Sequence, residues 1–173
     1  IGVPSSKLVL IYTATPTRTK SVHDAPRLDA SRLNVVYMGR ITADKGVSIL
    51  VDAALQIVAE RPDVDFYLIG DTKWQNPLAA ALIGRISGLG LSERIRFLGE
   101  LEDVPGVVKQ CHLHVCPSVA VEAFGQVVLE AKAQAIPSVV TPSGGLPETV
   151  FHLEDGFVCD DTTSDALYRG LRY

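Results

Sequence analysis

The sequence is poor in cysteine, in positive charge and in long apolar runs, and each shortage excludes a class of protein. Three irregularly spaced cysteines, Cys111, Cys116 and Cys159, cannot form a disulfide framework and indicate a reducing, cytoplasmic compartment. Sixteen basic against 20 acidic side chains give a net charge of −4, so we expect no nucleic-acid partner. No apolar run approaches the roughly 18 residues that span a bilayer, and no signal peptide is visible at the start. Association with a membrane surface stays undecided.

Two common nucleotide-binding loops are absent as well. The sequence has no Walker A loop, and no Gly-x-Gly-x-x-Gly follows the first regular strand, which argues against a dinucleotide-linked oxidoreductase. Two segments with metal-ligand residue types have structural explanations. Asp63-Val-Asp65 enters a strand at its amino end, and Cys111-His-Leu-His-Val-Cys116 lacks a second ligand cluster. We therefore expect no bound metal at either.

What the sequence does contain, from Asn34 onward, is a regular alternation of short apolar runs and helical patterns. Buried strands are predicted at 35–38, 66–69, 95–98, 113–116, 138–141 and 157–159. Helices are predicted at 47–58, 78–89 and 103–110, after Gly125 as far as Ala135, after Pro147, and from about Thr163. This alternation predicts an α/β, Rossmann-like domain with a mainly parallel sheet of about six strands and helices on both faces.

The first part of the chain has a different character. Leu8–Tyr12 could form a strand, but the segment from Thr19 to Arg32 has mixed charge and few apolar anchors. We therefore expect residues 1–33 to be an interdomain connection or edge segment and residues 34–173 to be the Rossmann-like domain. The chain begins at Ile1 and ends in a helical pattern, so we expect it to be a fragment.

The most informative stretch begins in the loop after the strand at 113–116. Glu122 lies just before a predicted helix start, and Glu130 is expected two turns inside that helix. Gly125 at the helix entrance would let a ligand approach the backbone, and unpaired N–H groups at a helix start suit an anion. The alternative is that Glu122 is an ordinary helix-start residue and Glu130 lies on a solvated face.

Other candidate residues also follow predicted strands. Arg40 comes after the first regular strand, and Lys45 lies at the next helix start, so the two side chains could hold a diphosphate from two sides. The alternative is that both are surface charges, with Asp44 as a partner. In a parallel sheet all these positions fall beyond the carboxyl ends of the strands, where ligands bind.

The segment Glu122-Ala-Phe-Gly-Gln-Val-Val-Leu-Glu130, with Pro137-Ser-Val-Val-Thr and Gly144-Gly-Leu-Pro-Glu148 after it, resembles the motif of the group 1 glycosyltransferases, retaining family 4. Gly39-Arg40 followed by Lys45-Gly46 is similar to that family's phosphate-binding segment. The resemblance covers roughly residues 34–160. It implies one half of a GT-B fold, the carboxy-terminal domain that binds a nucleoside diphosphate sugar.

The resemblance also implies roles for individual residues. Arg40 and Lys45 would hold the diphosphate, and Glu122 would bind the donor sugar and stabilise the reacting centre. Glu130 would accept hydrogen bonds from the ribose, and the backbone at Leu101 would contact the base. The pocket would be lined by Phe124, Gly125, Gln126 and Val127. No cofactor and no metal are expected.

The implied reaction moves a sugar to an acceptor hydroxyl with retention of configuration. The acceptor, which could be a sugar, a lipid or a polysaccharide, would bind an amino-terminal domain that this chain lacks, so we expect the chain alone to be inactive. Ala135 replaces a glycine that is usual in the family, which suggests a different helix cap. Two alternatives stay open: a non-catalytic nucleotide-sugar-binding module of a larger assembly, and a purely structural domain.

Overall fold

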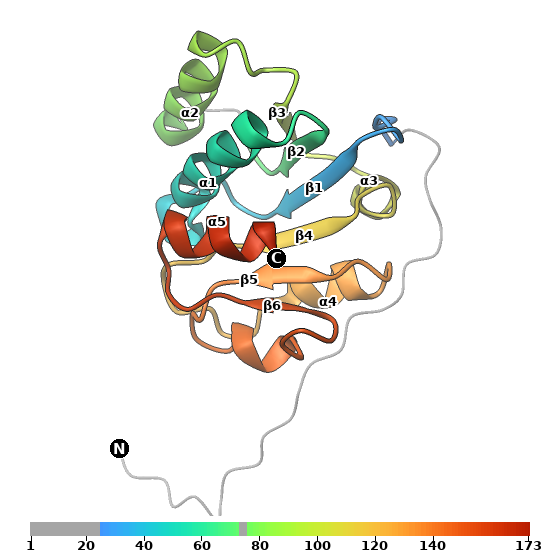
Figure 1. The fold of residues 1–173 in the computed structure, drawn as a ribbon, viewed down its shortest axis with the longest axis vertical. Helices are drawn as coiled ribbons and strands as arrows, with labels where there is room; N and C mark the ends of the chain where they lie inside the picture. The colour runs from blue at the N-terminus through green and yellow to red at the C-terminus, as the bar shows by residue number, and fades with distance from the viewer. Residues whose placement is uncertain (1–24, 73–75) are drawn as a thin grey trace, which may run out of the picture.

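A computed structural model describes residues 25–72 and 76–173 of the protein. The strands of the described part are β1 (Leu33–Met38), β2 (Val64–Ile69), β3 (Ile95–Gly99), β4 (Leu113–Cys116), β5 (Ser138–Val140) and β6 (Gly156–Val158). The helices are α1 (Val47–Glu60), α2 (Pro77–Gly88), α3 (Val104–Val108), α4 (Gln126–Lys132) and α5 (Ser164–Arg172), with 3-10 helices η2 (Ala43–Lys45) and η3 (Leu146–Thr149). Strands and helices alternate along the chain as predicted (Figure 1).

The strands form one parallel sheet in the order β3-β2-β1-β4-β5-β6. The chain builds outward from β1 through β2 to β3 and then returns to place β4 on the other side of β1. Val36 of β1 consequently lies opposite both Tyr67 of β2 and His114 of β4. The predicted Rossmann-like α/β fold is confirmed. In such sheets a ligand crevice opens beyond the strand ends where the order reverses, here between β1 and β4.

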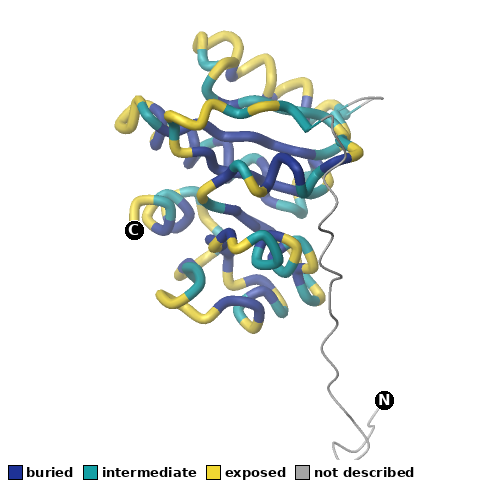
Figure 2. Tube along the Cα trace, turned by 90° about the vertical axis from the view of Figure 1, so that its right-hand side faces the viewer, coloured by how far each residue is buried: buried dark blue, intermediate teal, exposed yellow. Residues whose placement is uncertain are grey.

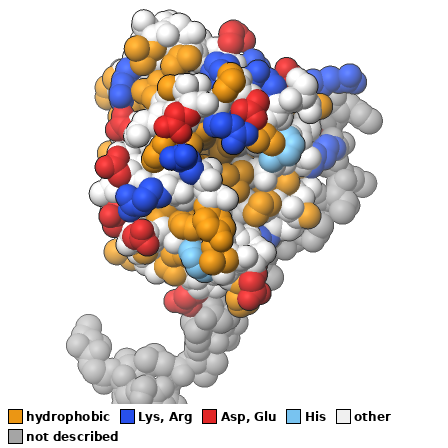
Figure 3. Space-filling model, viewed as in Figure 1, with side chains coloured by type: hydrophobic (Ala, Val, Ile, Leu, Met, Phe, Trp, Pro, Cys, Tyr) orange, Lys and Arg blue, Asp and Glu red, His pale blue; other side chains and the backbone are white. Residues whose placement is uncertain are grey.

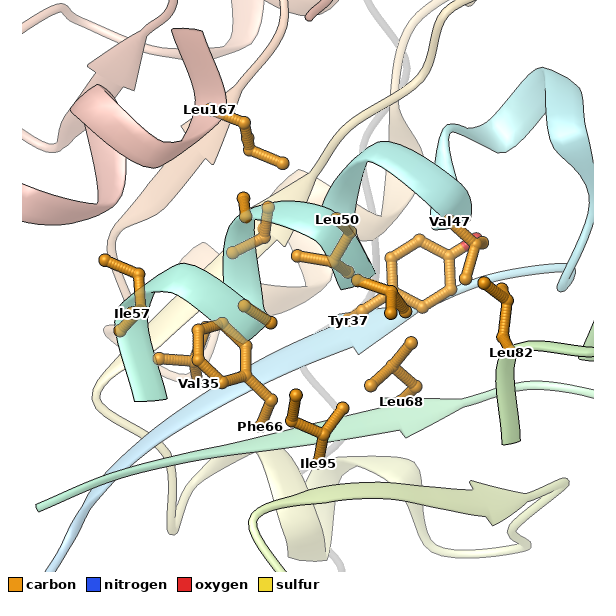
Figure 4. Packing of buried hydrophobic residues seen from close by; sticks show 14 of the residues in the cluster. Val35, Tyr37, Val47, Leu50, Ile57, Phe66, Leu68, Leu82, Ile95 and Leu167 are labelled. Carbon is orange, nitrogen blue, oxygen red and sulfur yellow. The ribbon is translucent and has the colours of Figure 1, made fainter. Parts of the chain in front are cut away.

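Both faces of the sheet are covered, which explains why its central strands are continuous apolar runs. Successive side chains of a strand point to opposite faces. Val35 and Tyr37 of β1 pack toward α1, α2 and α5, whereas Val36 and Met38 pack toward α3 and α4. Figure 4 shows the first of these two layers, with strand side chains pointing toward α1, where Leu50 lies, and with Leu167 of α5 pointing toward the same helix. The strands of the sheet form a buried band, and exposed segments lie on the outside of the molecule (Figure 2).

Side-chain caps define several helix starts. The side chains of Asn76, Asp103 and Thr163 accept hydrogen bonds from the main-chain N–H three residues on, at 3.0, 2.8 and 3.2 Å. These bonds satisfy N–H groups that have no partner within a helix. They fix the starts of α2, α3 and α5.

Several expected boundaries are wrong in detail. The helix predicted to reach Ala135 ends at Lys132, so Glu130 lies only about one turn inside α4. The helix predicted at 103–110 covers only α3, and η3 begins at Leu146, before Pro147. The different cap inferred from Ala135 is also wrong, because Ala135 adopts the left-handed conformation, with φ of 59°, that a glycine would favour there.

The described part of the connecting segment, residues 25–32, packs on the domain. Leu28 N–H donates to Gln110 Oε1 at 3.1 Å, and Gln110 Nε2 donates back to the carbonyl of Pro26 at 3.0 Å. Ala25 and Leu28 also contact the apolar layer under α3. This segment therefore has more apolar anchors than its sequence indicates. The possible strand at Leu8–Tyr12 lies outside the described residues.

Candidate functional site

A cavity of about 610 Å³ opens beyond the carboxyl ends of β1, β2 and β3 and is bounded on its other side by α3 and α4. It lies beyond the carboxyl ends of the strands, where parallel sheets bind ligands, and adjoins the point between β1 and β4 through Arg40 and α4. Its lining combines an apolar floor with polar side chains. The lining residues are Met38, Gly39, Arg40, Ile69, Gly70, Asp71, Glu100, Leu101, Glu102, Val104, Pro105, Val108, Gln126, Val127, Glu130, Ala133 and Gln134.

The structure brings five of the predicted site residues together around this cavity: Arg40, Leu101, Gln126, Val127 and Glu130. They come from loops after two different strands and from α4, far apart in the sequence. The other predicted residues, Lys45, Glu122, Phe124 and Gly125, do not line it and lie on the segments that continue from Arg40 and lead into Gln126. The predicted residues thus all lie beyond the carboxyl ends of the strands.

Arg40 lies on a loop that is fixed through its main chain. Tyr37 Oη, which is buried under the loop, donates to the carbonyl of Arg40 at 2.6 Å. Desolvation at this position raises the pKa of the Tyr37 phenol, so the hydroxyl stays a donor. The guanidinium itself forms an ion pair with Asp44 at 3.0 Å and is 69% exposed. A pair as exposed as this contributes little free energy, so the Arg40 side chain is available to an anion.

Lys45 and Glu122, predicted for different tasks, form an ion pair with each other. Lys45 Nζ donates to Glu122 Oε2, and the two side chains are 25% and 19% exposed. Ser118 Oγ donates to the same carboxylate oxygen at 3.3 Å. The end of η2 and the loop before α4 therefore meet at one carboxylate, which adjoins the segment that holds Arg40.

Main-chain contacts join the η2 segment to the loop after β4. The carbonyl of Asp44 accepts hydrogen bonds from the N–H groups of Val119 and Ala120 at 3.0 and 3.1 Å. Gly46, with φ of 70°, lies so close to Pro117 that a Cβ atom would overlap the Pro117 carbonyl oxygen. Only glycine fits both the conformation and the contact. The position of Lys45 is therefore set by backbone geometry.

The Gly144-Gly145 loop holds the main chain of Glu122 in the same way. Gly145 N–H donates to the carbonyl of Glu122 at 2.8 Å. A Cβ atom on Gly144 would overlap the same carbonyl, and its φ of 58° is in the left-handed region. This glycine pair, which the sequence singled out as a Gly-rich loop after a predicted strand, explains why the loop before α4 keeps one path.

The entrance of α4 is packed against η3. Gly125 is buried, and a side chain there would overlap Leu146, so the residue serves close packing as well as any approach of a ligand. Phe124 is half-buried. α4 has only seven residues, fewer than its sequence pattern suggests. The backbone role inferred for Phe124, Gly125, Gln126 and Val127 stays a prediction.

The two segments that might have suggested metal ligands have structural partners. Asp65 is 1% exposed and accepts from Arg32 Nε and Arg94 Nε, both at 2.7 Å, while Asp63 pairs with Arg61 at 2.7 Å. His114 is fully buried, with its Nδ1 3.0 Å from Ser138 Oγ. These contacts lie away from the cavity and hold strands and loops together.

Sequence reasoning missed part of the site. Asp71, Glu102 and Gln134 line the cavity, and Ser118 contacts Glu122, but none of them was assigned a role. Their positions in the sequence could have indicated Asp71 and Glu102, because both residues follow strands whose carboxyl ends border the cavity. Gln134 lies one helical turn after Glu130, so its position depends on where α4 ends.

The comparisons with known proteins agree with this geometry. The family model of glycosyl transferases group 1 matches residues 19–173. N-acetyl-alpha-D-glucosaminyl L-malate synthase of Bacillus anthracis is 31% identical over 171 residues, which cover 94% of this chain and 43% of that protein. The chain thus spans less than half the length of this curated relative.

Two solved structures share the fold at appreciable identity. HepE of Anabaena, in complex with UDP and glucose, has a TM-score of 0.73 at 33% identity, over 80% of this chain and 37% of that one. The C-terminal domain of the group 1 protein LpcC from Francisella tularensis has a TM-score of 0.73 at 26% identity, over 81% of this chain and 73% of that one. The family match, the relatives and the shared fold show that the chain belongs to the group 1 glycosyl transferases.

Proposed function

We propose that this chain is the donor-binding half of a retaining glycosyltransferase, which transfers a sugar from a nucleoside diphosphate sugar to an acceptor hydroxyl without a metal ion. The observation that supports this most directly is the gathering of Arg40, Leu101 and Glu130 around one cavity of about 610 Å³. The UDP and glucose bound by HepE of Anabaena, which is similar in fold and sequence, support a nucleotide-sugar ligand. The acceptor would bind a domain outside this chain.

Each proposed role follows from the chemistry of the group. Arg40, whose guanidinium is exposed, and Lys45, whose ammonium lies at the end of η2, would neutralise the diphosphate. Negative charge grows on the leaving diphosphate as the sugar bond breaks, and fixed cations stabilise that charge without a metal. Glu130 would accept from the ribose hydroxyls, and the base would lie against Leu101.

Glu122 would act on the sugar itself. Its carboxylate can accept hydrogen bonds from sugar hydroxyls, and its negative charge would stabilise positive charge at the reacting carbon. The Gly144-Gly145 loop holds its main chain, so the carboxylate would meet the sugar in a defined position. Because acceptor binding belongs to the proposed missing domain, the isolated chain should bind donor but transfer no sugar.

The test is titration calorimetry of the chain with UDP, GDP and ADP in the absence of divalent metal. We expect one of them to bind. Arg40→Ala and Glu130→Ala should each weaken that binding by roughly tenfold, because each removes a hydrogen bond to or from a charged group. A base-selective result would also name the nucleotide of the donor.

Matched controls separate a site effect from a loss of surface charge. Arg61 forms a surface ion pair with Asp63, much as Arg40 does with Asp44, but does not line the cavity. Glu154 is exposed and also lies outside the lining. Arg61→Ala and Glu154→Ala should leave the affinity unchanged. If neither Arg40→Ala nor Glu130→Ala weakens nucleotide binding, the proposed site is wrong. Sugar transfer by the chain alone would contradict the proposal that the acceptor binds a separate domain.

A further inference from the structure

The carboxylate of Glu122 is held by a buried hydroxyl that has no role in the proposal so far. Ser118 Oγ donates to Glu122 Oε2 at 3.3 Å, and Lys45 Nζ donates to the same oxygen. The two donors differ in mobility. Lys45 carries its ammonium on a long, flexible stem. Ser118 has a single rotatable bond and is 1% exposed.

Ser118 is fixed by bonds to two other segments. Its carbonyl accepts from the buried Thr141 Oγ1 at 2.6 Å, which ties it to the end of β5. The next residue, Val119, donates its N–H to the carbonyl of Asp44 at 3.0 Å, which ties the loop to η2. The Ser118 hydroxyl is therefore held where the ends of β4 and β5 and the η2 segment meet.

Ligand binding would affect the hydrogen bonds from Lys45 and Ser118 to Glu122 differently. A diphosphate offers more negative charge than one carboxylate, and the Lys45 ammonium can turn toward it. Glu122 would then lose part of its contact with Lys45 at the moment when it must meet the sugar. Ser118 does not reach outward, so its hydrogen bond to Oε2 can persist.

We propose that Ser118 is a positioning residue that keeps the Glu122 carboxylate oriented toward the donor sugar when the diphosphate engages Lys45. The inference rests on the proposed function, because it assumes that Glu122 contacts the sugar. It makes a separate claim, since Ser118 does not line the cavity and its hydroxyl donates to Glu122, not to Arg40 or Lys45.

A positioning role predicts a selective loss. Ser118→Ala should lower the affinity for a nucleotide sugar and leave the affinity for the matching nucleoside diphosphate unchanged. The ratio of the two affinities should fall by about five- to tenfold, the size expected for a hydrogen bond to a charged group. A structural role would lower both affinities together.

The experiment is titration calorimetry with two pairs of probes, UDP with UDP-glucose and GDP with GDP-mannose, using whichever pair the wild-type chain binds. Ser143→Ala is the matched control. Ser143 is a buried serine whose Oγ donates to the carbonyl of Ala120 in the same loop, away from the Glu122 carboxylate. We expect Ser143→Ala to leave the affinity ratio at its wild-type value.

A double-mutant cycle tests whether Ser118 acts through Glu122. Glu122→Gln should itself lower the ratio, and adding Ser118→Ala should lower it no further. Thermal unfolding checks that each variant folds. Should Ser118→Ala fail to fold, Ser118→Cys under reducing conditions keeps nearly the same volume with a weak donor and should give the same selective loss.

Three results would overturn the proposal: an unchanged ratio in Ser118→Ala, an equal fall in Ser143→Ala, or additive effects in the cycle. These outcomes leave the proposed function intact, because the wild-type chain still binds the nucleotide. Failure of the folded wild-type chain to bind any of the probes would instead remove the proposed function, and the role of Ser118 with it.

Discussion

At the scale of single residues, His114 has the most unusual environment. It lies in the middle of the sheet, fully buried, with its Nδ1 against Ser138 Oγ. Desolvation lowers the pKa of this imidazole to about 3, whereas a histidine in an unfolded chain has a pKa of about 6.5. Between these two values the unfolded chain binds a proton that the folded protein excludes.

Stability should therefore fall as the pH is lowered through this window. The free energy of unfolding should decrease by about 1.4 kcal/mol per pH unit from about pH 6.5 downward because of His114 alone. Urea unfolding at several pH values measures the slope, and His114→Gln should reduce it by that amount. An unaltered slope in His114→Gln would show that His114 does not cause this pH dependence of stability.

At the scale of an element, the turn after α4 stores backbone strain. Ala135 has φ of 59°, a conformation that costs a residue with a Cβ about 1–2 kcal/mol. The turn is closed by the N–H of Ile136, which donates to the carbonyl of Ala131 at 3.1 Å, and Ile136 packs in the layer beneath α3 and α4. Tertiary packing therefore holds the residue in this conformation.

Replacing Ala135 with glycine should stabilise the protein by about 0.5–1 kcal/mol, because the relief of strain exceeds the extra chain entropy of glycine in the unfolded state. Ala133→Gly is the matched control, since Ala133 has the ordinary helical φ of −63°. This variant should lower the free energy of unfolding by about 0.5–1 kcal/mol. Chemical denaturation of the two variants provides the comparison. Equal destabilisation by both would show that the turn is not strained.

Elements that depend on local pattern were predictable from the sequence, whereas contacts that depend on strand order were not. The runs at 35–38 and 66–69 indicated β1 and β2 because strands covered on both faces are continuously apolar. The ion pair between Lys45 and Glu122 joins residues 77 positions apart and requires β4 to lie beside β1. No local pattern specifies that adjacency, so this ion pair emerged only from the fold.

At the scale of the whole molecule, Asp65 joins the connecting segment to the sheet. It is 1% exposed and receives Arg32, which precedes β1, and Arg94, which precedes β3. Elsewhere, on the face shown in Figure 3, acidic and basic side chains are interspersed, and such exposed charges contribute little to stability. The buried charge of Asp65 is a different case, because two guanidinium groups depend on it.

Asp65→Asn should therefore destabilise the protein by about 2–3 kcal/mol, a value reduced from that for a fully buried pair because both arginines are partly exposed. Asp63→Asn removes an acid of the same type, two residues away, from a surface pair with Arg61 and should have a much smaller effect on stability. Urea unfolding monitored by circular dichroism compares the free energies of unfolding of the two variants. Similar losses in the two variants would contradict the special role of Asp65.

The strand order also governs how the chain can fold during its synthesis. β1 leaves the ribosome before the other strands of this sheet, but one of its two hydrogen-bonding neighbours, β4, is made only after α1, β2, α2, β3 and α3. Pairing of Val35 with Leu113 closes a long loop, and contacts between distant residues slow folding. One edge of β1 therefore stays open to other chains until β4 is made, so the nascent chain needs protection from association during this interval.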